Sequence, residues 1–352
     1  MSVMLTLVIA TFLAYMGLPF LGNAFDFPTA NIGSEYVQWG EKYNSDILHA
    51  SAFGTHVVII NSQQIADELL DRRGAKYSDR PYFPTIDLTG MSSYNLGVMR
   101  YGETWRIGRK YATQAFRQAG SPPNNLSSII VTSVHQVLKR ILHSPDNLWD
   151  HSKMISISIA MSSMYGYDAE SSKDPCVVAA DEAFIINMEL ASPGGSAQGD
   201  ARPSLVADLL ERKNTVGVSE KEEVAVMTIA PTTYIGASDP TKSAIGTFIY
   251  LMVINPDIQS KAQAEIDRIL ESKRLPGYED RPAMLYVEAI YRKVLRWKPP
   301  GSLGFPHAVT EDDFYDGYLI PKGATILSNI WLVILTGNFN GYEELIPTST
   351  GR

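Results

Sequence analysis

Trp105 and Arg109 are the side chains in this sequence whose types and spacing are best suited to hold an anion. They stand four residues apart in the segment YGETWRIGRK, whose pattern is helical. Residues with this spacing lie on one face of a helix, so an indole N–H and a guanidinium can donate to the same carboxylate. The alternative reading of each residue alone is a half-buried tryptophan and a surface arginine.

Other kinds of catalytic motif are absent from the sequence. The Gly- and Ser-containing stretch GGSAQG, residues 194–199, lacks the last glycine of a nucleophile elbow, because Gln198 stands there. There is no Gly-x-Gly-x-x-Gly and no phosphate loop, which argues against nucleotide chemistry. His135, His143 and His151 are eight residues apart, and this spacing does not stack them on one helical face as metal ligands. No metal-ligating residue is predicted.

Composition and charge limit the classes of protein that fit. The 352 residues are 45% hydrophobic and 19% charged, which predicts a globular chain with a large core. The net charge of −8, without a cluster of lysines and arginines, argues against a nucleic-acid partner. The one cysteine, Cys176, excludes an intramolecular disulfide and indicates a reducing compartment. We interpret Cys176 as a small, partly buried apolar side chain.

An uncharged, mostly apolar run at residues 3–21 is about long enough to cross a bilayer, although Gly17 and Pro19 shorten its helical part. It fits either a cleaved secretory signal or a retained membrane anchor. A secretory signal would begin with a positive charge and precede disulfide-forming cysteines, and both are missing. We therefore expect an anchor at residues 1–22.

The elements that must position these side chains are mostly helical. Apolar spacing predicts helices at residues 36–43, 62–73, 102–116, 126–143, 220–253, 256–270 and 286–297. Strands are expected at residues 47–52, 56–60, 314–319 and 324–327. Ser62 is the predicted N-cap of the second helix, and Pro231 and Pro240 are expected to interrupt the long one. Residues 191–203 can only form a loop.

The stretch AIYRKVLRWKPPGSLGFPHAVTEDDFYDGYLIPKGATILSNIW, residues 289–331, closely resembles the second half of fungal microsomal cytochromes P-450. Residues 101–110 and the Pro-rich entry at residues 18–28 agree with this resemblance. It implies a mainly α fold, the helical prism of that family with a small β-rich side domain, here incomplete. The prism would occupy residues 23–332, shortened near residues 168–203, and residues 333–352 would be a tail unlike the family.

The resemblance also implies a function. Members of this family are haem-dependent monooxygenases, so we expect oxidation of a small apolar organic substrate with dioxygen and electrons from a cytochrome reductase. The expected location is a membrane, the endoplasmic reticulum with the domain on the cytosolic side.

The site residues follow from the same resemblance. Trp105, Arg109 and His307 match contacts to the haem propionates, and Arg296 matches the arginine of the family's Glu-x-x-Arg motif. Asp239 falls on the acid position of the oxygen-activating helix.

The alcohol position beside that acid is Pro240, and Thr241 next to it would point about 100° away around the helix. Proton delivery through Thr241 is therefore expected to be impaired.

Three departures from the family pattern stand out. Lys293 replaces the glutamate that would pair with Arg296, and this should weaken the core. Two helices and part of the substrate roof are expected to be missing. After Trp331 the sequence does not reach the family's cysteine loop, so we expect no axial cysteine and no catalysis by the chain as written. The alternative is a non-catalytic, membrane-tethered remnant from a missing exon or mis-splicing.

Overall fold

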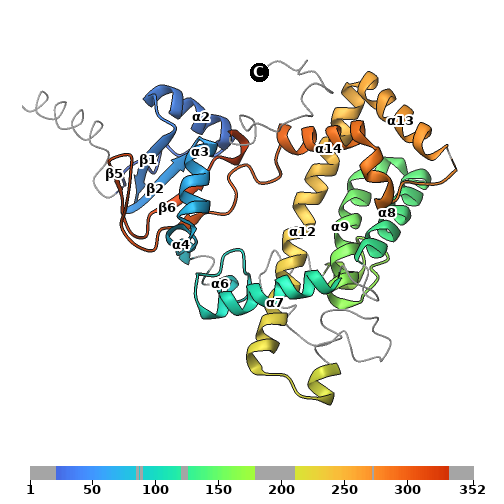
Figure 1. The fold of residues 1–352 in the computed structure, drawn as a ribbon, viewed down its shortest axis with the longest axis horizontal. Coiled ribbons are helices and arrows are strands. Elements are labelled where there is room, and N and C mark those ends of the chain that lie inside the picture. The colour runs from blue at the N-terminus through green and yellow to red at the C-terminus, as the bar shows by residue number, and fades with distance from the viewer. Residues whose placement is uncertain are drawn as a thin grey trace, which may run out of the picture. The chain divides into compact units, whose positions relative to one another are not determined.

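The computed structural model of the protein describes residues 21–84, 87, 90–119, 126–178, 211–271 and 273–332. The chain divides into two compact units (Figure 1). Unit 1 comprises residues 21–82 and 301–332 of the described chain, and unit 2 comprises residues 83–300. The expected anchor and the loop at residues 191–203 lie outside the described residues, apart from residues 21 and 22. Within the described ranges, no helix combines the length and the apolar character needed to cross a bilayer.

Unit 1 is built on a four-stranded sheet with the order β1-β2-β6-β3. The hairpin of β1 (Ile47–Ala52) and β2 (Thr55–Ile60) confirms the two strands expected there. Its turn residues Phe53 and Gly54 both have positive φ, as a two-residue hairpin turn of the mirror-image type requires. The strand β6 (Thr325–Ser328) runs parallel to β2, and β3 (His307–Ala308) pairs antiparallel with β6.

Apolar residues on both faces of this sheet are buried. On one face, Ile59 and Leu48 pack with Tyr36 of α2 (Ile32–Tyr43). On the other face, Val58, Ile60 and Ile326 pack with Leu69 and Tyr77 from the helices that follow β2. These helices are α3 (Gln63–Ala66), the π-helix η1 (Asp67–Arg72) and α4 (Gly74–Tyr77). The alternation along β2 explains how one strand joins two clusters.

The helical segment after β2 differs from expectation in two ways. Ser62 is the N-cap of α3, as predicted, but it caps through its carbonyl oxygen, which accepts from the Ala66 N–H at 3.0 Å, and its side chain makes no capping hydrogen bond. The segment also changes to π-helix, in which the Arg73 N–H reaches the Glu68 carbonyl at 3.0 Å, five residues back.

The single strand expected at residues 314–319 is also wrong. The chain there forms a hairpin of β4 (Asp313–Tyr315) and β5 (Tyr318–Ile320). Asp316 and Gly317 both have positive φ and turn the chain between the two strands. The Asp-Gly pair favours a two-residue hairpin turn, which divides the segment into two strands.

Unit 2 is helical, which confirms the mainly α fold. Its longest helix, α12 (Glu220–Ile254), packs along α9 (Leu148–Tyr165), and α9 packs on α8 (Leu126–His143). Figure 1 shows α7 (Glu103–Ala119) crossing α12 in this unit. The other helices of the described part of unit 2 are α6 (Met91–Tyr94), the 3₁₀ helices η2 (Pro145–Asn147) and η5 (Tyr278–Ala283), α13 (Pro256–Leu270) and α14 (Leu285–Trp297).

The helix α12 continues through Pro231 and Pro240, so the interruption expected there is wrong. Proline costs a helix about 3 kcal/mol in isolation, but packing on both sides can offset this. Ile229 and Tyr234, which flank Pro231, are almost fully buried against neighbouring helices. Tertiary packing therefore decides the conformation of this segment.

Candidate functional site

The first expected site residue, Trp105, stands on α7 in unit 2. Its indole Nε1 donates a hydrogen bond to the carbonyl oxygen of Leu96 at 3.1 Å. The backbone N–H of Leu96 in turn donates to Thr232 Oγ1 on α12, at 3.2 Å. Gly108 lies against Leu96 so closely that a β-carbon would be 2.7 Å from Leu96 Cδ2. The tryptophan is therefore held by a tight contact between α7, the segment before it and α12.

Arg109 lies with Trp105 along one hollow on α7, as the four-residue spacing predicts. The hollow has a volume of about 660 Å³ and is lined entirely by this helix. Arg106, Lys110 and Arg117 also line it, so it is strongly basic. Its side chains are suited to bind a carboxylate or phosphate, because several cations face the same space.

Arg296, near the end of α14, is half-buried, as is Lys293 one turn earlier. The start of α14 is fixed by Glu265 of α13. Its two carboxylate oxygens accept hydrogen bonds from the backbone N–H groups of Tyr286 at 3.0 Å and Val287 at 2.9 Å. Glu265 thus satisfies two amides at the N-terminus of the helix that presents Arg296.

The two expected catalytic residues lie on α12. Thr241 is half-buried, and the backbone of Asp239 is part of the helix. The side chain of Asp239 lies outside the described part of the structure. The hydroxyls of Thr228, Thr232 and Thr233, earlier on the same helix, donate to carbonyls four residues back at 2.7 to 2.9 Å.

His307 lies in β3 of unit 1, half-buried, and its Nδ1–H donates to the carbonyl of Tyr77 at 2.6 Å. Burial lowers the pKa of His307 and the charge of Arg80 lowers it further, while the bond to Tyr77 acts in the opposite direction. The ring is therefore neutral at neutral pH, with the lone pair on Nε2.

Sequence reasoning missed Arg80. Its Nη1 donates to the carbonyls of Pro306 at 2.8 Å and Phe305 at 3.2 Å, which places a guanidinium beside the strand that carries His307. These contacts join positions more than 220 residues apart, and no local pattern in the sequence around Arg80 signals them.

Cys176 is half-buried and packs against a cluster that includes Val137, Met161 and Tyr234. Its backbone N–H donates to Asp174 Oδ1 at 2.9 Å. The surroundings match the expected role of a small apolar side chain. There is no glycine-rich loop around it in the sequence.

Comparison with known proteins identifies the class. A sequence model of the family described as cytochrome P-450 matches residues 14–165 and 187–336. Cytochrome P-450 monooxygenase ple1 of Rhodocybe pseudopiperita is 31% identical, with 93% of this chain and 70% of the relative covered. Cytochrome P-450 monooxygenase 208 of Postia placenta is 32% identical, with 90% of this chain and 69% of the relative covered. Tryptamine 4-monooxygenase of Psilocybe cyanescens is 27% identical, covering 90% and 71%.

A solved structure of a zebrafish cytochrome P-450 with progesterone has a TM-score of 0.71 and 18% identity, and covers 86% of this chain and 79% of that one. This similarity confirms the fold. The chain belongs to the cytochrome P-450 family, in which the cofactor is haem and the relatives named above are monooxygenases.

A haem needs partners for its propionate carboxylates and a ligand for its iron, and the residues of this chain differ in how well they suit these two needs. A haem has two propionate carboxylates, and Trp105, Arg109, Arg296, His307 and Arg80 are donors of the kind that carboxylates require. The iron of this family takes a cysteine thiolate. Cys176 is the one cysteine in the 352 residues, and its position on the apolar cluster does not fit that role. Each of these donors, taken by itself, has the chemistry to bind a carboxylate, whereas Cys176 does not fit the role of the sulfur ligand.

Proposed function

We propose that this chain forms the haem-carrying fold of a monooxygenase that oxidises a small apolar organic substrate. The observation that carries the proposal is the family match over residues 14–165 and 187–336, together with relatives that are named monooxygenases. Dioxygen is the oxidant, and a cytochrome reductase supplies the electrons, as in the family. Tryptamine 4-monooxygenase, by its name, acts on a small aromatic amine, which agrees with a small organic substrate.

The porphyrin carboxylates are proposed to bind cationic and N–H donors. In unit 2 these are Trp105, Arg109 and Arg296, and in unit 1 they are His307 and Arg80. Carboxylates removed from water need charged or hydrogen-bonding partners, and an arginine can meet one with two parallel bonds. The indole of Trp105 would exchange its bond to the Leu96 carbonyl for a bond to the carboxylate.

His307 can contribute only after it takes up a proton. Its Nδ1–H already donates to the Tyr77 carbonyl. Nε2 must therefore be protonated before it can donate a hydrogen bond to a carboxylate. A propionate nearby would favour the charged ring and raise the pKa that burial now lowers. Haem binding should therefore be accompanied by proton uptake near neutral pH.

Asp239 and Thr241 are proposed to deliver protons during oxygen activation, with Thr241 the less effective of the two. Thr241 follows Pro240, which occupies the position of the usual alcohol, so its hydroxyl is turned about 100° from that position around the helix. In any preparation that turns over, Asp239→Asn should slow product formation more than Thr241→Ala does. Equal rates of product formation in both variants and the parent would contradict the proposed role of the two residues in proton delivery.

A membrane location is proposed from residues 3–21, which are long and apolar enough to anchor the chain. The endoplasmic reticulum, with the domain facing the cytosol, would place the protein beside a membrane-bound reductase. Fractionation of cells that express the full chain tests this location. Recovery of the chain in the soluble fraction would contradict it.

The sulfur ligand of the iron is proposed not to be Cys176. Consequently, a polypeptide made of these 352 residues alone should give no thiolate-type spectrum when haem is supplied and carbon monoxide binds the reduced iron. The packing of Cys176 also supports a second candidate function, a non-catalytic membrane-tethered protein. The spectrum and a hydroxylation assay with reductase decide between the two candidates. A thiolate-type band together with product formation would support the enzyme. The absence of both the band and the product would support the non-catalytic protein.

A further inference from the structure

The hairpin of β1 and β2 carries two histidines with adjacent ring nitrogens. His49 Nε2 and His56 Nδ1 lie 2.9 Å apart, and the ring centroids are 5.1 Å apart. Both side chains are exposed to solvent. Neither belongs to the residues assigned above to the haem.

The strand register explains why the rings meet. His49 pairs with Val58 and Ser51 pairs with His56, so the two histidines are diagonal neighbours on the same face of the hairpin. Long side chains at diagonal positions can touch across an antiparallel pair. Leu48 and Ala50, which point to the opposite face, are buried. Burial of Leu48 and Ala50 therefore holds the register of the two strands, and this register brings the two imidazole rings together.

The distance between the two nitrogens has a chemical meaning. At 2.9 Å the two nitrogens form an N–H···N hydrogen bond, in which one ring donates and the other accepts according to its tautomer, and a bound metal ion would take the place of the shared proton. Metal–imidazole bonds are about 2.0–2.1 Å long, so two such bonds at a right angle place the nitrogens about 2.9 Å apart. A tetrahedral angle would place them about 3.3 Å apart. The spacing lies close to both values, and the preference for Cu²⁺ over Zn²⁺ follows from the higher affinity of imidazole sites for Cu²⁺ among divalent first-row metals.

We propose that His49 and His56 form a two-histidine binding site for a divalent transition-metal ion, with Cu²⁺ preferred over Zn²⁺. Within the described residues, no group of three or more His, Cys, Asp or Glu side chains is placed to hold a metal, so water completes the coordination. A hollow of about 790 Å³ beside the rings has room for this water, and Asp26 and Lys42 on its wall offset each other in charge.

Partial desolvation of His49 and the neighbouring His56 lower the pKa of His49. Only a neutral imidazole offers a lone pair to a metal.

The test is a titration of the full chain with copper(II) chloride, followed by electron paramagnetic resonance. We expect one Cu²⁺ per chain whose spectrum carries the splitting of two imidazole nitrogens. Loss of one of two ligands should lower the affinity for Cu²⁺ about 100-fold. His49→Gln and His56→Gln should therefore each lower the affinity by this factor, and the spectrum of each variant should show one imidazole nitrogen. Both histidines are exposed, and far-UV circular dichroism of the metal-free variants checks that they fold.

His143→Gln is the matched control, because His143 is an exposed histidine on α8, and this variant should bind copper like the parent. A parent spectrum without two imidazole nitrogens would overturn the proposal whatever the variants do. Parent-like affinity in His49→Gln or His56→Gln would also overturn it. Zinc binding as tight as copper binding would refute the stated preference.

Discussion

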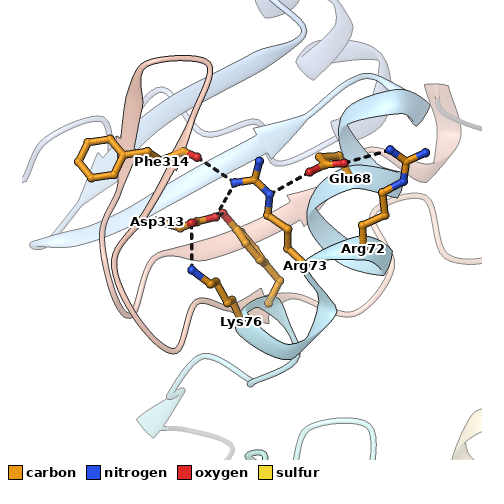
Figure 2. A network of polar contacts seen from close by, with 7 residues as sticks. Glu68, Arg72, Arg73, Lys76, Asp313 and Phe314 are labelled. Atoms are coloured by element: carbon orange, nitrogen blue, oxygen red, sulfur yellow. Dashed lines mark hydrogen bonds and ion pairs between the residues drawn. The ribbon is translucent and has the colours of Figure 1, made fainter.

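The phenol of Tyr77 donates a hydrogen bond of 3.0 Å to the carboxylate of Asp313, a residue 236 positions later in the chain. Arg73 Nη1 and Lys76 Nζ reach the same carboxylate at 2.9 and 3.2 Å, and Arg73 also binds Glu68 at 3.0 Å (Figure 2). The network joins the helices after β2 to the β4–β5 hairpin. It stabilises the unit that presents Arg80 and His307.

Removal of the Asp313 charge should destabilise unit 1. In Asp313→Asn, two cations lose their common partner and the buried phenol of Tyr77 loses a charged acceptor, at a cost of about 2 kcal/mol. Urea unfolding at neutral pH measures this. Glu311→Gln is the matched control, because Glu311 binds the same Lys76 from a mostly exposed position, and its loss should have no measurable effect. Equal stability of both variants would contradict this prediction.

The ion pair of Asp280 with Arg274 should make unit 2 sensitive to acid. Two hydrogen bonds of 2.6 Å from Arg274, together with the Gly277 N–H, lower the pKa of Asp280 from 3.8 to about 2. A lowered pKa in the folded state means that this stabilisation is complete above pH 3.8 and is lost as the pH falls through about 2.

Unfolding of Asp280→Asn and the parent, compared between pH 7 and 2, tests this dependence. The variant should be less stable at neutral pH, and the gap should close as the solution becomes more acidic. Glu279→Gln serves as the control, because Glu279 lies 3.7 Å from the same guanidinium and is mostly exposed. A gap that stays constant with pH would argue against the ion pair.

Glu265→Ala should loosen the start of α14, because two backbone amides lose their acceptor. Loss of such a cap costs about 1 kcal/mol. Amide hydrogen exchange should rise at Tyr286 and Val287, whereas Gln263→Ala, on an exposed position of the same helix α13, should change nothing. Unchanged exchange in Glu265→Ala would mean that the helix start is held by other contacts.

Arg80→Gln should raise the pKa of His307, because the charge of Arg80 is one of the factors that lower it. Nuclear magnetic resonance of the histidine ring protons measures the shift, with Arg72→Gln, an exposed arginine of the same unit, as the control. In the parent, the lowered pKa of His307 means that stability declines as the pH falls below 6.5, since the unfolded chain takes up the proton first. A pKa that stays the same in Arg80→Gln would show that the charge of Arg80 does not help to lower it.

Much of the fold follows from local pattern. The strand at residues 47–52 and the helices at residues 126–143 and 256–270 have the predicted bounds, because their apolar spacing and flanking turn or cap residues agree. The errors arise where local and long-range effects compete. Pro240 does not break α12, and Asp316-Gly317 turns a segment that looked like one strand.

The candidate site is only partly readable from the sequence. The spacing of Trp105 and Arg109 correctly places both side chains on one hollow. The bond of the indole to Leu96 and the approach of Arg80 to the strand of His307 depend on tertiary packing, which no local spacing encodes. The histidine pair on the hairpin has the same origin, since its geometry comes from strand register.

Cys176 is proposed not to ligate the iron, although the chain has the haem-binding fold of its family, and the choice between the two candidate functions depends most on this point. The most direct measurement is the carbon monoxide difference spectrum of the reduced, haem-supplied full chain, taken beside its Cys176→Ser variant. We expect both proteins to give the same spectrum, without a thiolate-type band. A thiolate-type band in the parent that disappears in Cys176→Ser would contradict the claim.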